Sequence, residues 1–160
     1  MTVIFESEQS LCRVAAQMAR GWRDAGLAPL IVGLTGDLGV GKTTFVRAML
    51  EGLGYTGRVP SPTYTLLEHY EVGALNIIHL DLYRLAEARE LEFLGLRDWL
   101  ADPAVWVLAE WPEKGGAFAE SLDLRLTLAI RPDESRSIVP LAQSERGERA
   151  LQLWLGADFN

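Results

Sequence analysis

The chain is poor in cysteine and histidine and has no long apolar run, and each shortage narrows the possibilities. Among its 160 residues there is one cysteine, Cys12, so no disulfide can form within the chain. The two histidines, His69 and His79, are too isolated to indicate a metal site. No apolar run reaches the roughly 18 residues of a membrane span, and residues 1–6 lack the basic start of a signal peptide. We therefore expect a cytoplasmic protein that does not enter a membrane.

Clusters of positive charge are also missing. The net charge is −7 at pH 7, because 22 acidic residues outnumber 15 lysines and arginines. Free-standing nucleic-acid-binding proteins usually carry a basic patch, so any contact with nucleic acid should depend on another protein. Hydrophobic residues make up 49% of the chain, which excludes a disordered protein. The length fits one domain over residues 1–160.

One of the only two lysines, Lys42, lies in a complete P-loop motif. The octet that matches G-x-x-x-x-G-K-[ST] is Gly36-Asp37-Leu38-Gly39-Val40-Gly41-Lys42-Thr43. At this chain's composition, such a match should arise by chance about once per thousand chains. Its glycines allow backbone amides to point at phosphate oxygens, Lys42 should reach the β- and γ-phosphates, and the Thr43 hydroxyl can bind Mg²⁺. The motif predicts that the chain binds a nucleoside triphosphate.

The rest of the pattern predicts an α/β fold of the P-loop NTPase type. A central mixed, largely parallel sheet should be flanked by helices and carry antiparallel hairpins. The segments expected to form strands are 2–5, 30–34, 65–71, 75–81, 105–109, 122–130 and 137–141. The segments expected to form helices are one that Ser7 caps, 44–53, 84–100 with a break at Gly95, and 145–155. Residues 111–116 should form a loop.

Two acidic residues follow apolar strands and are candidates for the metal side of the site. The strand before Glu110 is apolar at every position, as is typical of a sheet centre, and its carboxyl end should open onto the P-loop crevice. We therefore predict that Glu110 binds the metal, directly or through water. Asp81 would position or activate the attacking water, or lie in the outer shell of the metal. The Asp81 strand belongs to a predicted hairpin, which leaves its place open, and the two roles could be exchanged.

Residues 61–64, Ser-Pro-Thr-Tyr, offer a further candidate in the Thr63 hydroxyl. Such a hydroxyl can sense a γ-phosphate in a loop that prolines restrict. A plain junction between loop and strand explains the segment as well. The same two readings, ligand contact or ordinary packing, stay open for Tyr83, Arg84 and Trp111.

Together these segments resemble the TsaE (YjeE) family of small bacterial P-loop ATPases. The matching segments, in family order and spacing, are 36–44, 61–66, 79–85, 90–93 and 110–113. The resemblance covers nearly the whole chain and is most specific over residues 34–114. It implies a part in making the threonylcarbamoyl group on the adenosine beside the anticodon of tRNA. Members bind the TsaB–TsaD complex, meet tRNA only indirectly, hydrolyse ATP weakly when alone and do not transfer the group themselves.

The resemblance also implies roles for single residues. Lys42 and Thr43 would handle phosphate and Mg²⁺, while Glu110 and Asp81 would be the acids of the site. Residues 61–65, including Thr63, would form a switch loop, and Trp111 would lie beside the site. Nucleotide contacts would come from the P-loop octet and from Ser10, Thr44, Lys114 and Arg136.

A P-loop also occurs in other classes of nucleotide-binding protein. A small P-loop kinase usually needs an arginine-rich lid, and the sequence has no clear lid segment. A GTPase normally reads guanine through N-K-x-D, and neither Asn76 nor Asn160 lies in that motif. A nucleotide-gated binding module with incidental hydrolysis stays open as an alternative.

Overall fold

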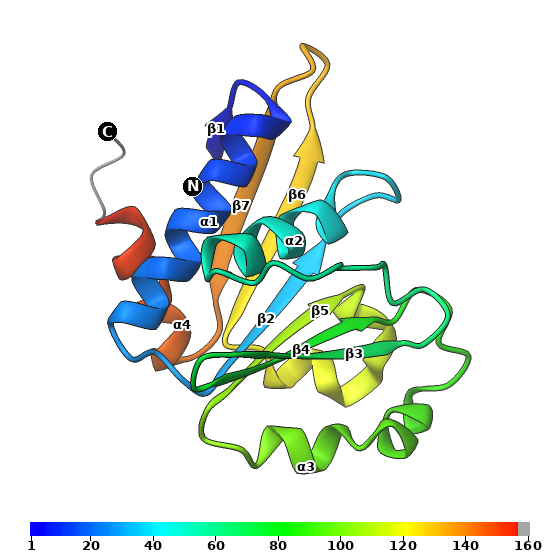
Figure 1. Cartoon of the computed structure of the whole chain (residues 1–160). Helices are drawn as coiled ribbons and strands as arrows, with labels where there is room; N and C mark the ends of the chain where they lie inside the picture. Colours follow the sequence, from blue (N-terminus) through cyan, green and yellow to red (C-terminus); the bar gives the residue numbers. More distant parts are fainter. Residues whose placement is uncertain (157–160) are drawn as a thin grey trace.

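A seven-stranded mixed sheet forms the centre of the computed structural model, which describes residues 1–156 (Figure 1). Its strands are β1 (Val3–Phe5), β2 (Leu30–Thr35), β3 (Leu67–Val72), β4 (Leu75–Asp81), β5 (Val105–Glu110), β6 (Leu124–Ile130) and β7 (Arg136–Ala142). They lie in the order β1-β7-β6-β2-β5-β4-β3. The central strands β6, β2, β5 and β4 are parallel, and the outer strands β1, β7 and β3 join antiparallel. This confirms the predicted α/β fold.

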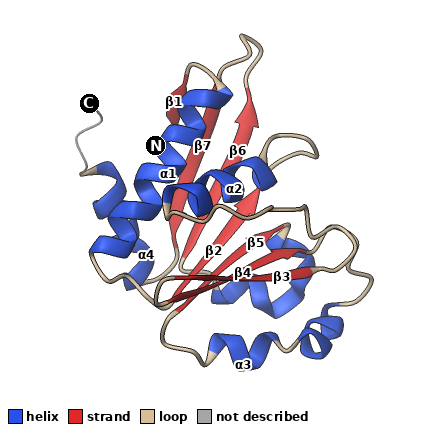
Figure 2. Ribbon diagram, in the orientation of Figure 1, coloured by secondary structure: helices blue, strands red, loops and turns tan. Residues whose placement is uncertain are grey.

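Helices cover both faces of the sheet (Figure 2). One face carries α1 (Glu8–Asp24), α2 (Lys42–Gly52) and α4 (Glu145–Leu155). The other carries α3 (Leu96–Leu100) and two 3-10 helices, η1 (Ala88–Leu94) and η2 (Pro112–Ser121). Within residues 1–156, none of the helices has the length and apolar character needed to cross a membrane.

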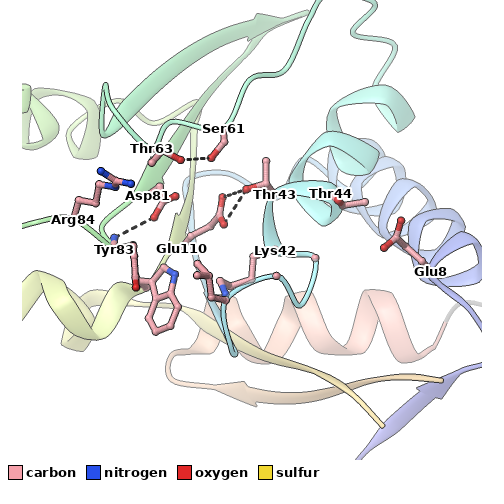
Figure 3. A pocket seen from close by; sticks show the side chains of 14 residues that line it. Glu8, Lys42, Thr43, Thr44, Ser61, Thr63, Asp81, Tyr83, Arg84 and Glu110 are labelled. Atoms are coloured by element: carbon pink, nitrogen blue, oxygen red, sulfur yellow. Dashed lines mark hydrogen bonds between the residues drawn. The ribbon is translucent and has the colours of Figure 1, made fainter. Parts of the chain in front are cut away.

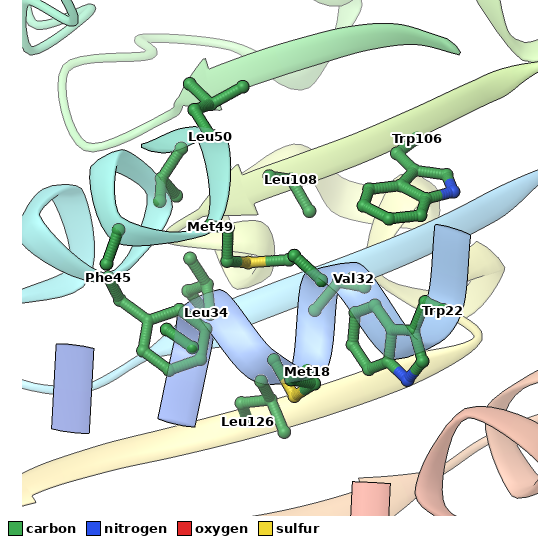
Figure 4. Close-up of a cluster of buried hydrophobic side chains, with 14 of the residues drawn as sticks. Met18, Trp22, Val32, Leu34, Phe45, Met49, Leu50, Trp106, Leu108 and Leu126 are labelled. Atoms are coloured by element: carbon green, nitrogen blue, oxygen red, sulfur yellow. The ribbon is translucent and has the colours of Figure 1, made fainter. Parts of the chain in front are cut away.

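The larger core lies between the sheet and α1 and α2 (Figure 4). Alternate residues of a strand face opposite sides, so Val32 and Leu34 of β2 join Trp106 and Leu108 of β5 on this face. Trp22 of α1 packs edge-on against Trp106, with 5.9 Å between the ring centroids. The two rings have almost no exposed surface. The apolar stripe of α1 is therefore core packing, as its spacing predicts.

Two segments differ from the sequence prediction. Residues 84–100 are predicted to form a helical region with a break at Gly95. The break lies at Gly95, whose φ is 74°, but the region before it is helical only from Ala88, as the 3-10 helix η1, and the region after it is the short α3. Residues 111–116 were expected to be a loop, yet η2 begins there. Proline is favourable at the start of a helix because its φ is already helical, and Pro112 occupies the first position of η2. Helical geometry is interrupted at Gly116.

Candidate nucleotide-binding site

The P-loop connects the carboxyl end of β2 to the amino end of α2. Gly36 and Gly41 have φ values of 139° and 108°, a region that other residues rarely adopt. At Gly36 an added Cβ would also lie 2.4 Å from the carbonyl oxygen of Leu128. Gly41 offers no side chain to cap the helix that begins at Lys42. The first N–H groups of α2 are therefore available to an anion, and the helix dipole favours negative charge there.

Lys42 lies inside this loop and is 4% exposed. Its Nζ donates hydrogen bonds to the carbonyl oxygens of Gly36 and Asp37, at 2.7 and 2.9 Å. Burial lowers the pKa of Lys42, and nearby carboxylates oppose that shift. The ammonium group is thus held inside the loop by backbone carbonyl groups of the loop itself.

Trp111 lies beside Lys42. Its ring centroid is 4.5 Å from the Lys42 Nζ and 5.0 Å from the ring of Tyr83. Its backbone takes the left-handed conformation, with φ of 55°, which costs about 1–3 kcal/mol in a residue other than glycine. The N–H of Trp111 donates to the carbonyl oxygen of Leu34 at 3.2 Å, which ties the end of β5 to the P-loop strand. Strain of this kind is characteristic of functional sites.

The two candidate acids lie at the ends of neighbouring strands. β4 pairs antiparallel with β3 and also parallel with β5, and the second pairing sets Asp81 directly opposite Glu110. β5 in turn lies next to the P-loop strand β2. The Thr43 hydroxyl donates to the Glu110 carboxylate, with 3.0 and 2.8 Å to its two oxygens (Figure 3). Asp81 therefore lies in the site even though its strand, β4, also forms a hairpin with β3.

Asp81 differs from Glu110 in its partners. Its Oδ1 accepts the backbone N–H of Tyr83 at 3.1 Å. Burial raises the pKa of Asp81, and the Tyr83 amide partly opposes the rise. A carboxylate with a raised pKa is better suited to accept a proton near neutral pH.

His79 is a site residue that sequence reasoning overlooks. It is fully buried, and its Nε2 lies 2.5 Å from Oε2 of Glu110. The available signal was its spacing of two residues from Asp81, which places both side chains on one face of β4. That signal becomes informative only once the pairing of β4 with β5 is known.

A pocket of about 350 Å³ opens over these groups (Figure 3). Its lining comes from the P-loop, the 61–64 segment and the ends of β4 and β5: Glu8, Leu38, Gly39, Gly41, Lys42, Thr43, Thr44, Ser61, Thr63, Asp81, Tyr83, Arg84, Glu110 and Trp111. Most of the residues predicted from the sequence are thus brought together. Glu8 was not predicted.

Six predicted nucleotide contacts lie outside this lining: Gly36, Asp37 and Val40 of the P-loop, and Ser10, Lys114 and Arg136. Ser10 forms a capping box with Ser7, since each backbone N–H donates to the other hydroxyl at 3.1 Å. Lys114 lies against Tyr83, with Nζ 5.1 Å from the ring centroid. Arg136 lies 3.9 Å from the carboxylate of Glu8 and so reaches only the edge of the pocket.

The loop before β3 lines the same pocket as Asp81 and Glu110. The hydroxyls of Ser61 and Thr63 are 2.7 Å apart and lie across the pocket from the P-loop (Figure 3). Leu66 donates its N–H to the carbonyl oxygen of Pro62 at 2.8 Å and accepts the N–H of Asp81 at 3.0 Å. Because these hydrogen bonds connect the loop to Asp81, a movement of the loop would also displace the backbone of Asp81.

The donor atoms of the site fit a hard divalent cation. The Thr43 hydroxyl and the carboxylates of Glu110 and Asp81 are oxygen donors, which Mg²⁺ prefers. Across residues 1–156, no group of three His, Cys, Asp or Glu side chains is arranged to hold a metal by itself. Mg²⁺ usually takes one or two protein ligands together with phosphate oxygens and water. The residues therefore fit a metal that arrives with a nucleotide.

The chain is similar to known proteins in sequence and in fold. A family model described as threonylcarbamoyl adenosine biosynthesis protein TsaE matches residues 5–138. The tRNA threonylcarbamoyladenosine biosynthesis protein TsaE of Haemophilus influenzae is 43% identical over 122 residues, which cover 76% of each chain. The protein of the same name from Aquifex aeolicus is 38% identical over 139 residues, 85% of this chain and 92% of that one. The crystal structure of Bacillus subtilis YdiB is similar with a TM-score of 0.74 and 26% identity, over 98% of this chain and 94% of that one.

Proposed function

The chain belongs to the TsaE family of threonylcarbamoyl adenosine biosynthesis proteins, and from this membership we propose that it is a Mg²⁺-dependent ATPase of tRNA modification. It acts on the TsaB–TsaD complex and does not itself transfer the threonylcarbamoyl group. Its ATPase rate is low when it is alone and rises with the partners. It meets tRNA through those partners, in keeping with its net charge of −7.

One observation carries the proposal, the hydrogen bond from Thr43 to Glu110 inside the P-loop pocket. Because the hydroxyl proton is directed at the carboxylate, the hydroxyl oxygen keeps its lone pairs for a cation. A P-loop threonine joined to a strand-end acid is the arrangement that P-loop NTPases use for nucleotide-bound Mg²⁺. Its place next to Lys42 supports binding of metal and phosphates as one unit.

In this proposal each residue of the site has one defined role. The P-loop amides, the start of α2 and Lys42 hold the phosphates. Thr43 and Glu110 would hold Mg²⁺, which neutralises phosphate charge when bound. Asp81, whose pKa burial raises, orients the attacking water and takes its proton. Thr63, on the loop across the pocket, contacts the terminal phosphate.

The experiment measures nucleotide binding and turnover on the purified chain. Isothermal titration with ATP, ADP and GTP, with Mg²⁺ or with EDTA, should show a preference for adenine nucleotides that Mg²⁺ strengthens. Phosphate release should be slow and should rise when TsaB and TsaD are added. Equal affinity for GTP would favour a GTPase.

A pull-down of the partners with and without ATP tests the switch. Nucleotide-dependent capture of TsaB–TsaD without any phosphate release would favour a gated binding module. No capture and no stimulation of hydrolysis would refute the proposed partners.

A further inference from the structure

The proposed function leaves one buried contact of the site unused, the pair His79 and Glu110. The Nε2 of His79 and the Oε2 of Glu110 are 2.5 Å apart, with 0% and 4% of the two side chains exposed. The same Oε2 accepts the Thr43 hydroxyl at 2.8 Å. His79 therefore touches the carboxylate from the protein interior, while Thr43 touches it from the pocket.

The geometry determines which ring nitrogen carries the proton. An ionised carboxylate only accepts hydrogen bonds, so Nε2 of His79 has to be the donor. The Nδ1 atom is buried and has no hydrogen-bond partner among residues 1–156. Among residues 1–156, Nε2 is thus the only ring nitrogen of His79 with a hydrogen-bond partner, and its proton is directed at Glu110.

The fold itself has no need of a polar side chain here. The neighbours of His79 in β4, Ile78 and Leu80, are fully buried apolar residues, as expected for a strand covered on both faces. A buried polar side chain in such a strand costs free energy unless it is hydrogen-bonded. The side-chain partner of His79 is Glu110, on the neighbouring strand. The histidine is thus explained by what it does to that carboxylate.

We propose that His79 is a positioning residue, whose Nε2–H holds the Glu110 carboxylate in the orientation that receives the Thr43 hydroxyl. It thereby sets how strongly Mg²⁺ increases nucleotide affinity. Groups that hydrogen-bond a metal ligand from behind typically change metal affinity 10- to 100-fold when removed. The inference rests on the proposed function, because it assigns Glu110 to the metal side.

Two variants separate positioning from packing. His79→Leu puts an apolar side chain of similar size at this position, and it donates no hydrogen bond. In His79→Gln the side-chain amide can still donate to Glu110. Titration with ADP should show that His79→Leu loses about 10- to 100-fold of the affinity gained from Mg²⁺. In EDTA its affinity should stay within about threefold of the parent, and His79→Gln should recover most of the gain. Equal losses with Mg²⁺ and EDTA, or a glutamine variant as weak as the leucine variant, would overturn the inference.

A second measurement needs no nucleotide. The chain has only two histidines, so protein labelled with ¹⁵N-histidine gives two imidazole spectra, and a His69→Gln variant assigns them. The His79 spectrum should show a proton on Nε2, and its chemical shifts should change in a Glu110→Gln variant. An Nε2 atom that carries no proton, or chemical shifts that do not change in Glu110→Gln, would refute the contact. If the parent shows no effect of Mg²⁺ on affinity, the metal part of the proposed function fails, and these spectra still decide the contact.

Discussion

Replacing Lys42 with alanine should remove much of the affinity for ATP and leave the fold intact. Lys42 is 4% exposed, and its ammonium group donates to two loop carbonyls, those of Gly36 and Asp37. Both carbonyls belong to the loop that would surround the phosphates. The ammonium can exchange these acceptors for phosphate oxygens by a short movement of its flexible stem.

The size of the loss follows from what the ammonium would bind. A hydrogen bond that involves a charged group contributes about 1.5–3 kcal/mol. Loss of one such bond corresponds to an increase in Kd of about 10- to 150-fold. Stability should change by less than about 1 kcal/mol, because the lost hydrogen bonds are offset by relief of the burial that lowers the pKa of Lys42.

Titration with Mg²⁺-ATP measures the Kd, and urea unfolding measures the stability. The chain offers one matched control, since Lys114 is its only other lysine and lies against Tyr83 outside the pocket lining. Lys114→Ala should change the Kd by less than about threefold. A Lys42→Ala protein that binds within threefold of the parent would refute the assignment of Lys42 to the phosphates. A loss of the same size in Lys114→Ala would instead assign Lys114 to the nucleotide, as the family resemblance implies.

Three other substitutions test separate parts of the structure. Glu110→Gln should abolish the increase in nucleotide affinity that Mg²⁺ gives, and an unchanged ratio of Kd values in Mg²⁺ and EDTA would remove Glu110 from the metal side. Asp81→Asn should stabilise the protein by about 0.5–2 kcal/mol at pH 7. Burial raises the folded-state pKa of Asp81 above the usual aspartate pKa of about 3.9. The contribution of Asp81 to stability is therefore fully present below that pH and is lost as the pH rises through the folded-state pKa. Urea unfolding should therefore show the gain shrinking towards pH 4, and a gain that does not depend on pH would contradict this. Gly52→Ala should cost about 1–3 kcal/mol in urea unfolding, because its Cβ would lie 2.6 Å from the Cα of Ala16. Gly21→Ala, where an added Cβ meets nothing within 4 Å, is the control and should not destabilise.

The P-loop could be predicted from the sequence because its determinants are local. The apolar run of β2, the glycines with positive φ and the start of α2 lie within about twenty consecutive residues. The hairpin of β3 and β4 is equally local, since only Gly73 and Ala74 separate the strands. For such elements the order of residue types along the chain is enough.

The neighbours of β2 could not be predicted in the same way. β2 lies between β5 and β6, which come about seventy and ninety residues later in the chain. Strand pairing over such separations depends on how whole faces pack and leaves little trace in either segment alone. Glu110 was assigned correctly to a strand at the sheet centre because residues 105–109, which precede it in β5, are all apolar, and such a run has to be covered on both sides.

The register of β4 against β5 connects Asp81 and His79 to the same acid. In the observed pairing Asp81 stands opposite Glu110, and His79, two residues earlier, points to the same face of the sheet. A shift of one residue would turn both side chains towards the opposite face, where Leu80 now packs in the smaller core. The positions of Asp81 and His79 beside Glu110 are therefore consequences of one pairing. In the sequence alone, a histidine in an apolar strand has no evident role. Once the pairing is known, His79 is the residue whose hydrogen bond depends on the correct placement of Glu110.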